Sequence, residues 1–192
     1  QAAGHAASGY ARISRKAAVC VTSSGPGATN LITALATAYA DSIPLIAITG
    51  QVNTAQLGKD VFQEADITGA VESFVKYSYI VKNVEDIPRV FKESFVKYSY
   101  LVKSADDIPR IFKEAFYIAS TGRKGPVLID IPCDVQIDLL KKSFDYTSEV
   151  NIRGYKPNTS VHIGQLKRAL KMLQKAKKPL FLAGGGVNIA HA

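Results

Sequence analysis

Three short runs of apolar residues constrain the fold of this chain more than any other feature. They are AAVCVTSS at 17–24, IPLIAITG at 43–50 and PVLIDIP at 126–132. Each is far shorter than the ~20 residues that a membrane-spanning helix needs. Continuous runs of this length are typical of strands buried on both faces of a parallel sheet. Between them, residues 28–40 and 108–119 carry apolar residues at helical spacing. This alternation predicts an α/β fold with a mostly parallel sheet and helices on both faces.

Composition and charge argue against a nucleic-acid-binding protein. The chain has 192 residues, 47% of them hydrophobic, and a formal net charge of +8. Leu166, Leu170 and Leu173 recur at helical spacing within the densest basic run, which predicts an amphipathic surface helix over 160–176. Its basic side is interpreted as solvated and binding no nucleic acid, because interleaved aromatic residues are missing. The basic residues of the run are Lys167, Arg168, Lys171, Lys175, Lys177 and Lys178.

Changes of pattern along the chain predict two domains. Residues 1–135 form the first, and 136–160 read as a linker because the apolar periodicity disappears there. Residues 161–192 open a second α/β domain with the helix of 160–176 and a strand in PLFLAGGGV at 179–187. Cys20 and Cys133 lack metal-type spacing, so we interpret both as reduced thiols of a cytoplasmic protein with no membrane segment.

A tandem duplication lies within the first domain. SFVKYSYIVKNVEDIPRVFKE at 73–93 is followed directly by SFVKYSYLVKSADDIPRIFKE at 94–114, with sixteen of twenty-one positions identical. One extra copy cannot build a solenoid, which needs about three repeats. The Glu93–Ser94 junction has no turn residue, which argues against an additional strand. Either the first helix runs on or one copy is extruded as a loop. We expect 94–114 to hold the regular position, meaning the place in the domain that a single copy would occupy, because its helix continues into AFYIASTG at 115–122.

TSSGPGATN, residues 22–30, is a glycine-rich turn between a predicted strand and a predicted helix. Such a turn lets a planar or anionic ligand approach the main chain closely. Tight packing at a strand–helix corner is an equally good interpretation. LAGGGV at 182–187 is a weaker signal of the same kind, since it lacks the full dinucleotide-binding pattern.

Taken in order, several segments resemble the large, catalytic subunit of acetolactate synthase, also called acetohydroxyacid synthase. These segments are GHAASGYAR (4–12), TSSGPGATNLITALATAYADSIPLIAITGQV (22–52), GKDVFQEADI (58–67), STGRKGPVLIDIP (120–132) and KPLFLAGGGV (178–187). The resemblance covers the chain apart from one copy of the duplication. It implies the thiamine diphosphate-binding fold, with residues 1–135 as an N-terminally truncated pyrimidine domain and 161–192 as the start of an FAD-binding domain.

The function implied by the resemblance is decarboxylation of pyruvate and transfer of the two-carbon unit to a second 2-oxo acid. The cofactors would be thiamine diphosphate and FAD, with Mg²⁺ bound by a carboxy-terminal domain. In the family, a glutamate directly before the residue that matches Gln1 bonds the aminopyrimidine ring; these 192 residues do not include it. No GDG segment occurs either, so no metal site is predicted, and the fragment alone is expected to be inactive.

Individual site residues follow from the resemblance. Gly25, Pro26 and Asn30 would line the pyrimidine side of the cofactor, and Phe62 and Gln63 would lie near the reacting carbon. The FAD contacts would be Arg123 together with Gly184, Gly185 and Gly186. Without the resemblance, Phe62 reads as core, Gln63 as an exposed loop amide and Arg123 as a helix-end charge.

The chain departs from the family pattern at Asn53, where proline is usual, and at Cys133, where lysine is usual. Both positions neighbour the substrate channel in the family, so the resemblance does not specify substrate access at these two positions. The implied partners are a second copy in a homodimer or higher oligomer, a small regulatory subunit and small 2-oxo acids. Two alternatives stay open: another thiamine diphosphate carboligase or decarboxylase, and a non-catalytic dimerisation or cofactor-binding module.

Overall fold

The computed structural model describes residues 1–76, 100–101, 104–139, 143, 146, 149–152, 154–158 and 160–190. The chain divides into two compact units, Gln1–Tyr155 and Lys156–Ala192. In the first copy, the alternation of Val75, Tyr77, Tyr79 and Val81 predicts a strand, and residues 77–81 of that strand lie outside the described residues.

The first unit alternates helices and strands. Its first half contains α1 (Ala2–Ser14), β1 (Ala18–Thr22), α2 (Pro26–Thr29), α3 (Ile32–Ala40), β2 (Leu45–Gln51), η1 (Thr54–Gln56), α4 (Ile67–Val71) and η2 (Glu72–Phe74). Its second half contains β3 (Tyr100–Leu101), η4 (Ala105–Asp107), α6 (Ile108–Ser120), β4 (Val127–Pro132) and α7 (Cys133–Ile137). The three apolar runs coincide with β1, β2 and β4. The sequence pattern did not predict α1.

The strands form one parallel sheet in the order β1-β2-β4-β3. Strand β4 is buried at every position. Its alternate residues belong to different cores: Leu128 packs on one face and Ile129 on the other. This two-sided burial explains why β4 is continuously apolar, and it confirms the predicted α/β fold class. Strand β1 was also expected to be buried on both faces, but as an edge strand it is buried on one face only, and Val19 and Val21 are 43% and 65% exposed.

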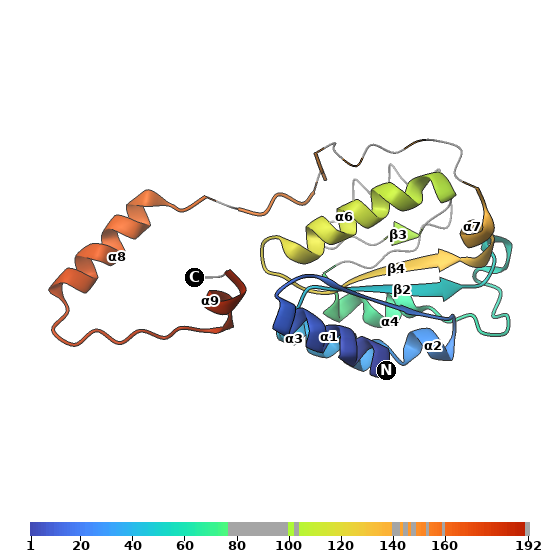
Figure 1. Cartoon of the computed structure of the whole chain (residues 1–192), viewed down its shortest axis with the longest axis horizontal. Helices are drawn as coiled ribbons and strands as arrows, with labels where there is room; N and C mark the ends of the chain where they lie inside the picture. The colour runs from blue at the N-terminus through green and yellow to red at the C-terminus, as the bar shows by residue number, and fades with distance from the viewer. Residues whose placement is uncertain are drawn as a thin grey trace. The chain divides into compact units, whose positions relative to one another are not determined.

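Helices cover both faces of the sheet. In Figure 1, α1, α3 and α4 lie on one side of β2 and β4, and α6 lies on the other. On α6, Ile111, Ala115 and Ile118 are almost completely buried. Phe116 shares the apolar spacing predicted over 108–119 but is 40% exposed, because the face of α6 that packs on the sheet passes through Ile118 instead.

Small side chains allow α1 and α3 to pack closely. Ala34 and Ala38 of α3 are fully buried. A Cβ atom on Gly4 of α1 would come within 2.6 Å of the Ala34 Cβ, so only glycine fits at this crossing. The alanine-rich sequence of 28–40 therefore allows α3 to pack closely against α1.

Both copies of the duplication contribute to the first unit. From the first copy, Val75 is 1% exposed, and the Lys76 amide donates to the Pro126 carbonyl oxygen at 2.9 Å. From the second copy, Tyr100 pairs with Ile129 of β4, and α6 follows. Tyr79, the first-copy equivalent of Tyr100, stands three positions after Lys76, as Ile129 stands three positions after Pro126. Lys76 of the first copy and Tyr100 of the second therefore contact β4 about as far apart as Lys76 and Tyr79 would in a single copy. The two spacings agree to within one residue.

This arrangement refines the expectation that 94–114 holds the regular position. Tyr100 and Leu101 lie in the sheet and α6 follows them, as expected. Phe74, Val75 and Lys76 of the first copy, however, also pack into the unit. The regular position is therefore shared between the copies.

The second unit contains α8 (Ile163–Lys175) and α9 (Gly185–Ala190). Helix α8 confirms the amphipathic helix predicted over 160–176, and its apolar side chains are exposed; Leu170, for example, is 55% exposed. The predicted strand in PLFLAGGGV is wrong, because residues 179–184 form no strand and α9 begins at Gly185. A lone strand leaves its backbone groups unpaired, and the described part of this unit offers no other strand to pair with. None of the described helices is long and apolar enough to cross a membrane.

Candidate functional site

Most of the predicted site residues of the first unit lie where parallel strands end. Gly25 follows β1, the loop containing Phe62 and Gln63 follows β2, and Cys133 follows β4. The carboxyl ends of parallel strands meet at one edge of a sheet, where ligands of open α/β folds commonly bind. This edge is the candidate site.

The turn after β1 requires glycine at position 25. Gly25 has φ 58° and ψ −123°, a conformation that side chains with a Cβ rarely adopt. A Cβ at this position would come within 3.0 to 3.2 Å of the backbone oxygen, Cα and Cβ of Gln63. Two predicted site residues from separate segments are therefore in direct contact.

Pro26 and Asn30 complete the same turn. Pro26 occupies the first turn of α2, where its missing N–H is not needed. The Asn30 side-chain amide donates to the Pro26 carbonyl oxygen at 2.8 Å. The structure thus brings Gly25, Pro26, Asn30 and Gln63 into one cluster.

The loop over 57–64 is tightly folded. Gly58, Asp60 and Gln63 all have positive φ, of 76°, 53° and 63°. The Glu64 carboxylate accepts hydrogen bonds from the backbone N–H of Gly58 and, at 3.2 Å, from that of Val61. Phe62 is 89% exposed, so its interpretation as a core residue is wrong. A large apolar side chain held outward beside Gly25 and Gln63 is suited to covering a ligand.

A buried carboxylate lies beneath this edge. Asp130 of β4 is 1% exposed and accepts hydrogen bonds from Thr49 Oγ1 at 2.7 Å and Gln51 Nε2 at 3.0 Å. Burial raises the pKa of Asp130 to about 6, while the two hydrogen bonds act in the opposite direction. Gln51 Nε2 also donates to the Ala65 carbonyl oxygen at 3.0 Å. The network therefore joins the centre of the sheet to the end of the 57–64 loop.

The two positions that depart from the family pattern lie beside a contact between neighbouring loops. Thr54, next to Asn53, donates from its backbone N–H to Asp134 Oδ1 at 3.1 Å and from its hydroxyl to Oδ2. Asp134 follows Cys133, which is an exposed free thiol. Burial acts to raise the pKa of Asp134, but the Thr54 hydrogen bonds hold it below its usual value. Asn53 and Cys133 thus belong to the same edge of the sheet as Gly25 and Gln63.

Arg123 lies at the opposite edge of the sheet. It precedes β4, and its Nε donates to the hydroxyl of Ser42, which precedes β2, at 2.9 Å. Its guanidinium lies over the Tyr39 ring, 5.8 Å from the ring centroid. The structure therefore does not bring Arg123 together with the Gly25 cluster.

Gly184, Gly185 and Gly186 belong to the second unit. All three are exposed, and a Cβ added to any of them would meet no atom within 4 Å. Gly185 begins α9. No packing within the described residues accounts for three consecutive glycines.

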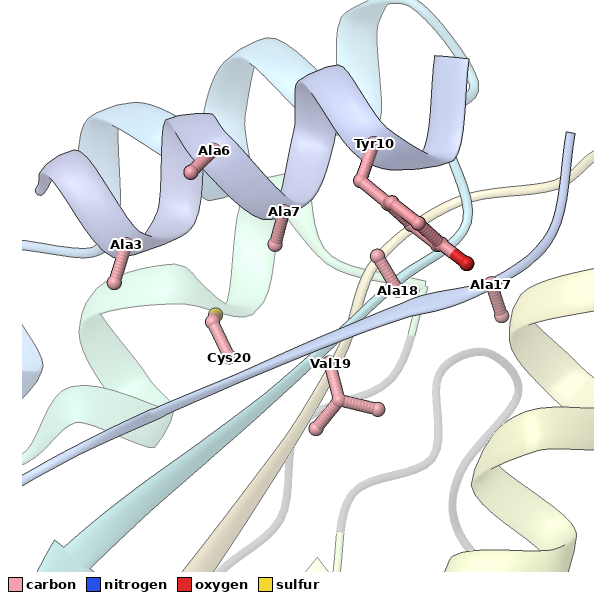
Figure 2. A pocket seen from close by; sticks show the side chains of 8 residues that line it. All are labelled: Ala3, Ala6, Ala7, Tyr10, Ala17, Ala18, Val19 and Cys20. Atoms are coloured by element: carbon pink, nitrogen blue, oxygen red, sulfur yellow. The ribbon is translucent and has the colours of Figure 1, made fainter. Parts of the chain in front are cut away.

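A surface cavity of about 400 Å³ lies between α1 and β1. Figure 2 shows that α1 lines it with small side chains, including Ala3 and Ala7, and that Cys20 of β1 faces them. Burial raises the pKa of Cys20, so its thiol stays protonated and unreactive. None of the predicted site residues lines this cavity.

The Gly25 cluster fits the aromatic half of thiamine diphosphate better than its anionic half. Together with the exposed ring of Phe62, it combines a turn without side-chain bulk and two amides, which suit a planar heterocycle with hydrogen-bonding edges. None of its members carries a positive charge. Within the described ranges, no three His, Cys, Asp or Glu side chains come close enough to hold a metal ion.

Sequence reasoning missed three residues that shape this edge. Asp130 is the only charged residue in the apolar run PVLIDIP, and a lone acid within a buried strand indicates a carboxylate that needs hydrogen-bond partners. Gln51 and Glu64 carry no such signal, because their roles depend on loop geometry.

Comparisons with known proteins point to one kind of enzyme. Residues 1–70 match the family described as "Thiamine pyrophosphate enzyme, N-terminal TPP binding domain". The chain is 47% identical over 187 residues to the acetolactate synthase large subunit of Buchnera aphidicola subsp. Schizaphis graminum, covering 97% of this chain and 29% of the relative.

Two further relatives agree. The chain is 46% identical over 195 residues to a probable acetolactate synthase large subunit of Methanocaldococcus jannaschii, covering all of this chain and 29% of the relative. It is 45% identical over 191 residues to the acetolactate synthase large subunit of Haemophilus influenzae, covering all of this chain and 30% of the relative. The chain thus spans less than a third of the length of these relatives.

Proposed function

We propose that the protein of which this chain is part condenses two 2-oxo acids with loss of CO₂, because nearly all of the chain is similar to acetolactate synthase large subunits. The substrates would be two pyruvates, or pyruvate and 2-oxobutyrate, as in branched-chain amino-acid biosynthesis. The observation that carries the proposal is the contact between Gly25 and the Gln63 backbone at the carboxyl edge of the sheet.

Thiamine diphosphate, when bound, supplies a nucleophilic carbon and an electron sink for the decarboxylation. The residues of this chain hold and enclose its pyrimidine side. Gly25 and Pro26 allow the ring to approach the main chain. The Asn30 side chain presents its oxygen to the ring as a hydrogen-bond acceptor, since its nitrogen donates to the Pro26 carbonyl oxygen. Exposed Phe62 excludes water from the reacting carbon, and Gln63 orients the substrate through its amide.

The remaining cofactors and partners extend this proposal. Arg123 and Gly184–Gly186 contact FAD, and Mg²⁺ binds to a part of the protein beyond these residues. The protein assembles as a homodimer or higher oligomer, with a small regulatory subunit as a further partner. Both described cysteines are free thiols, which supports a cytoplasmic location.

A matched pair of variants tests the roles of the loop residues. The full-length protein would be assayed for acetolactate formation from pyruvate with thiamine diphosphate, Mg²⁺ and FAD. Gln63→Asn keeps an amide and a residue that tolerates positive φ, but it shortens the reach of the side chain. We expect kcat/KM to fall roughly tenfold or more, because a small misplacement of a substrate-orienting group is costly.

Gln56→Asn is the control, since Gln56 is an exposed amide in the same connection after β2. It should leave kcat/KM unchanged. Equal activity of both variants would contradict the role of Gln63. A folded wild-type protein that binds thiamine diphosphate without forming acetolactate would favour the non-catalytic module, and one that forms a different product would favour another carboligase or decarboxylase.

A further inference from the structure

The Glu64 side chain is hydrogen-bonded to the backbone of its own loop, residues 57–64. Each of its carboxylate oxygens accepts one backbone hydrogen bond, from Gly58 and from Val61. The Glu64 backbone N–H in turn donates to the Val61 carbonyl oxygen at 3.0 Å. A carboxylate that accepts several backbone N–H groups strongly favours its ionised form, and the pKa of Glu64 is lowered, first by the Gly58 hydrogen bond. The Glu64 side chain is therefore negatively charged, and backbone hydrogen bonds hold it against the loop.

This fold of the loop requires unfavourable backbone conformations. Asp60 and Gln63 have positive φ although neither is glycine. Such residues are held in place only where the surrounding contacts determine them. The Glu64 hydrogen bonds span both positions, since they join Gly58 and Val61 to residue 64.

The loop is also fixed at its outer contacts. Gln63 packs against Gly25, and the Ala65 carbonyl oxygen accepts a hydrogen bond from Gln51. Glu64 lies between these two anchored neighbours. Its carboxylate faces the loop backbone, where each oxygen already accepts a hydrogen bond.

We propose that Glu64 is a positioning residue for the candidate site: its two backbone hydrogen bonds set the loop geometry that places Phe62 outward and Gln63 against Gly25. This rests on the proposed function, because it assigns the purpose of the loop to the same reaction. Glu64 differs from Phe62 and Gln63 in acting through the backbone.

Substitution of Glu64 by glutamine tests the proposal. Glu64→Gln keeps the size but replaces one acceptor oxygen by an NH₂ group, which cannot accept from a backbone N–H. In the full-length protein we expect kcat/KM for pyruvate to fall roughly tenfold to hundredfold, since reacting groups misplaced by about 1 Å lose that much. The amides of Gly58 and Val61 should exchange faster with solvent deuterium, while the midpoint of thermal unfolding stays within about 2 °C because the loop is peripheral.

Two further variants serve as controls. Asp60→Asn removes the same charge from the same loop but neither acceptor, and asparagine tolerates its positive φ. It should match wild type in both measurements. Glu64→Asp keeps both acceptor oxygens and should recover part of the lost activity and amide protection.

The outcomes separate this proposal from the proposed function. Wild-type kcat/KM and amide exchange in Glu64→Gln would overturn the positioning role. Equal losses in Asp60→Asn would overturn it too, because charge alone would then be responsible. If wild type forms no acetolactate, the proposed function is wrong, and amide exchange in Glu64→Gln still decides whether Glu64 sets the loop.

Discussion

The buried carboxyl group of Asp130 makes the stability of the folded state depend on pH. Its pKa is raised from 3.8 to about 6 by burial, so the folded state keeps the proton over a pH range where the unfolded chain has lost it. A carboxyl group shifted in this direction contributes stability below its unfolded pKa, and that contribution is lost as pH rises to its folded pKa. The free energy of unfolding should therefore fall between about pH 4 and pH 6 on account of Asp130.

The variant Asp130→Asn removes this contribution. The shift corresponds to on the order of 3 kcal/mol, so the stability of the variant relative to wild type should rise by up to that amount between pH 4 and pH 7. Urea unfolding across this range measures the difference. Glu114, whose pKa burial raises to about 7, adds a slope of the same sign that both proteins share. Parallel pH profiles of the two proteins would contradict the assignment.

At the scale of elements, apolar pattern predicted most of the first unit. Strands β1, β2 and β4 and helices α3 and α6 were predicted because the sequence of each carries a continuous apolar run or apolar residues at helical spacing. Helix α1 escaped prediction because alanine and glycine give little contrast between buried and exposed faces. The strand expected at 179–184 failed because strand formation depends on a partner strand, which local sequence does not specify.

The candidate site likewise has a part that the sequence predicted and a part that it did not. Gly25, Pro26 and Asn30 are close in sequence, and the glycine turn predicted their cluster. Contact between Gly25 and Gln63 could not be read from spacing, since it depends on how the 57–64 loop folds back. Glu64 was likewise visible only as part of the segment GKDVFQEADI, which gave no sign of the backbone hydrogen bonds that its carboxylate accepts.

The shared position of the two copies predicts which deletion the first unit tolerates. Removing residues 77–97 joins Lys76 to Tyr98 and keeps the anchors at Pro126 and Ile129. The connection from Lys76 to Tyr100 shortens from 23 residues to two. Loop-closure entropy then favours folding by up to about 2 kcal/mol. Urea unfolding should show equal or higher stability than the undeleted chain.

Removing residues 77–96 provides the control for this deletion. It leaves one residue more between the two anchors, so the excess of this segment over the matching part of β4 grows from one residue to two, and more of the strand must bulge or lose its pairing. This variant should be less stable than the first. The reverse order, or loss of folding in the 77–97 deletion, would show that the unit needs both copies.

At the scale of the whole molecule, the boundary between the units lies later than the loss of sequence pattern suggests. Ile152 is 8% exposed and packs in the core beside α6. The Tyr155 hydroxyl accepts from the Lys76 ammonium at 3.0 Å, and that ammonium also donates to the carbonyl oxygens of Ile118 and Thr121 near the end of α6. Residues expected to be linker therefore close the first unit.

Two truncations test this boundary. Every described side chain from Ser160 to Val187 is exposed, so a chain that ends at Tyr155 should keep the unfolding free energy of the full chain to within about 0.5 kcal/mol. A chain that ends at Glu149 also loses the buried Ile152 side chain and the Tyr155 hydrogen bond. It should be less stable by about 2–4 kcal/mol, from lost apolar burial and an ammonium deprived of one acceptor. Urea unfolding of the three chains checks both values, and equal stability of the two truncations would mean that the unit ends before Ile152.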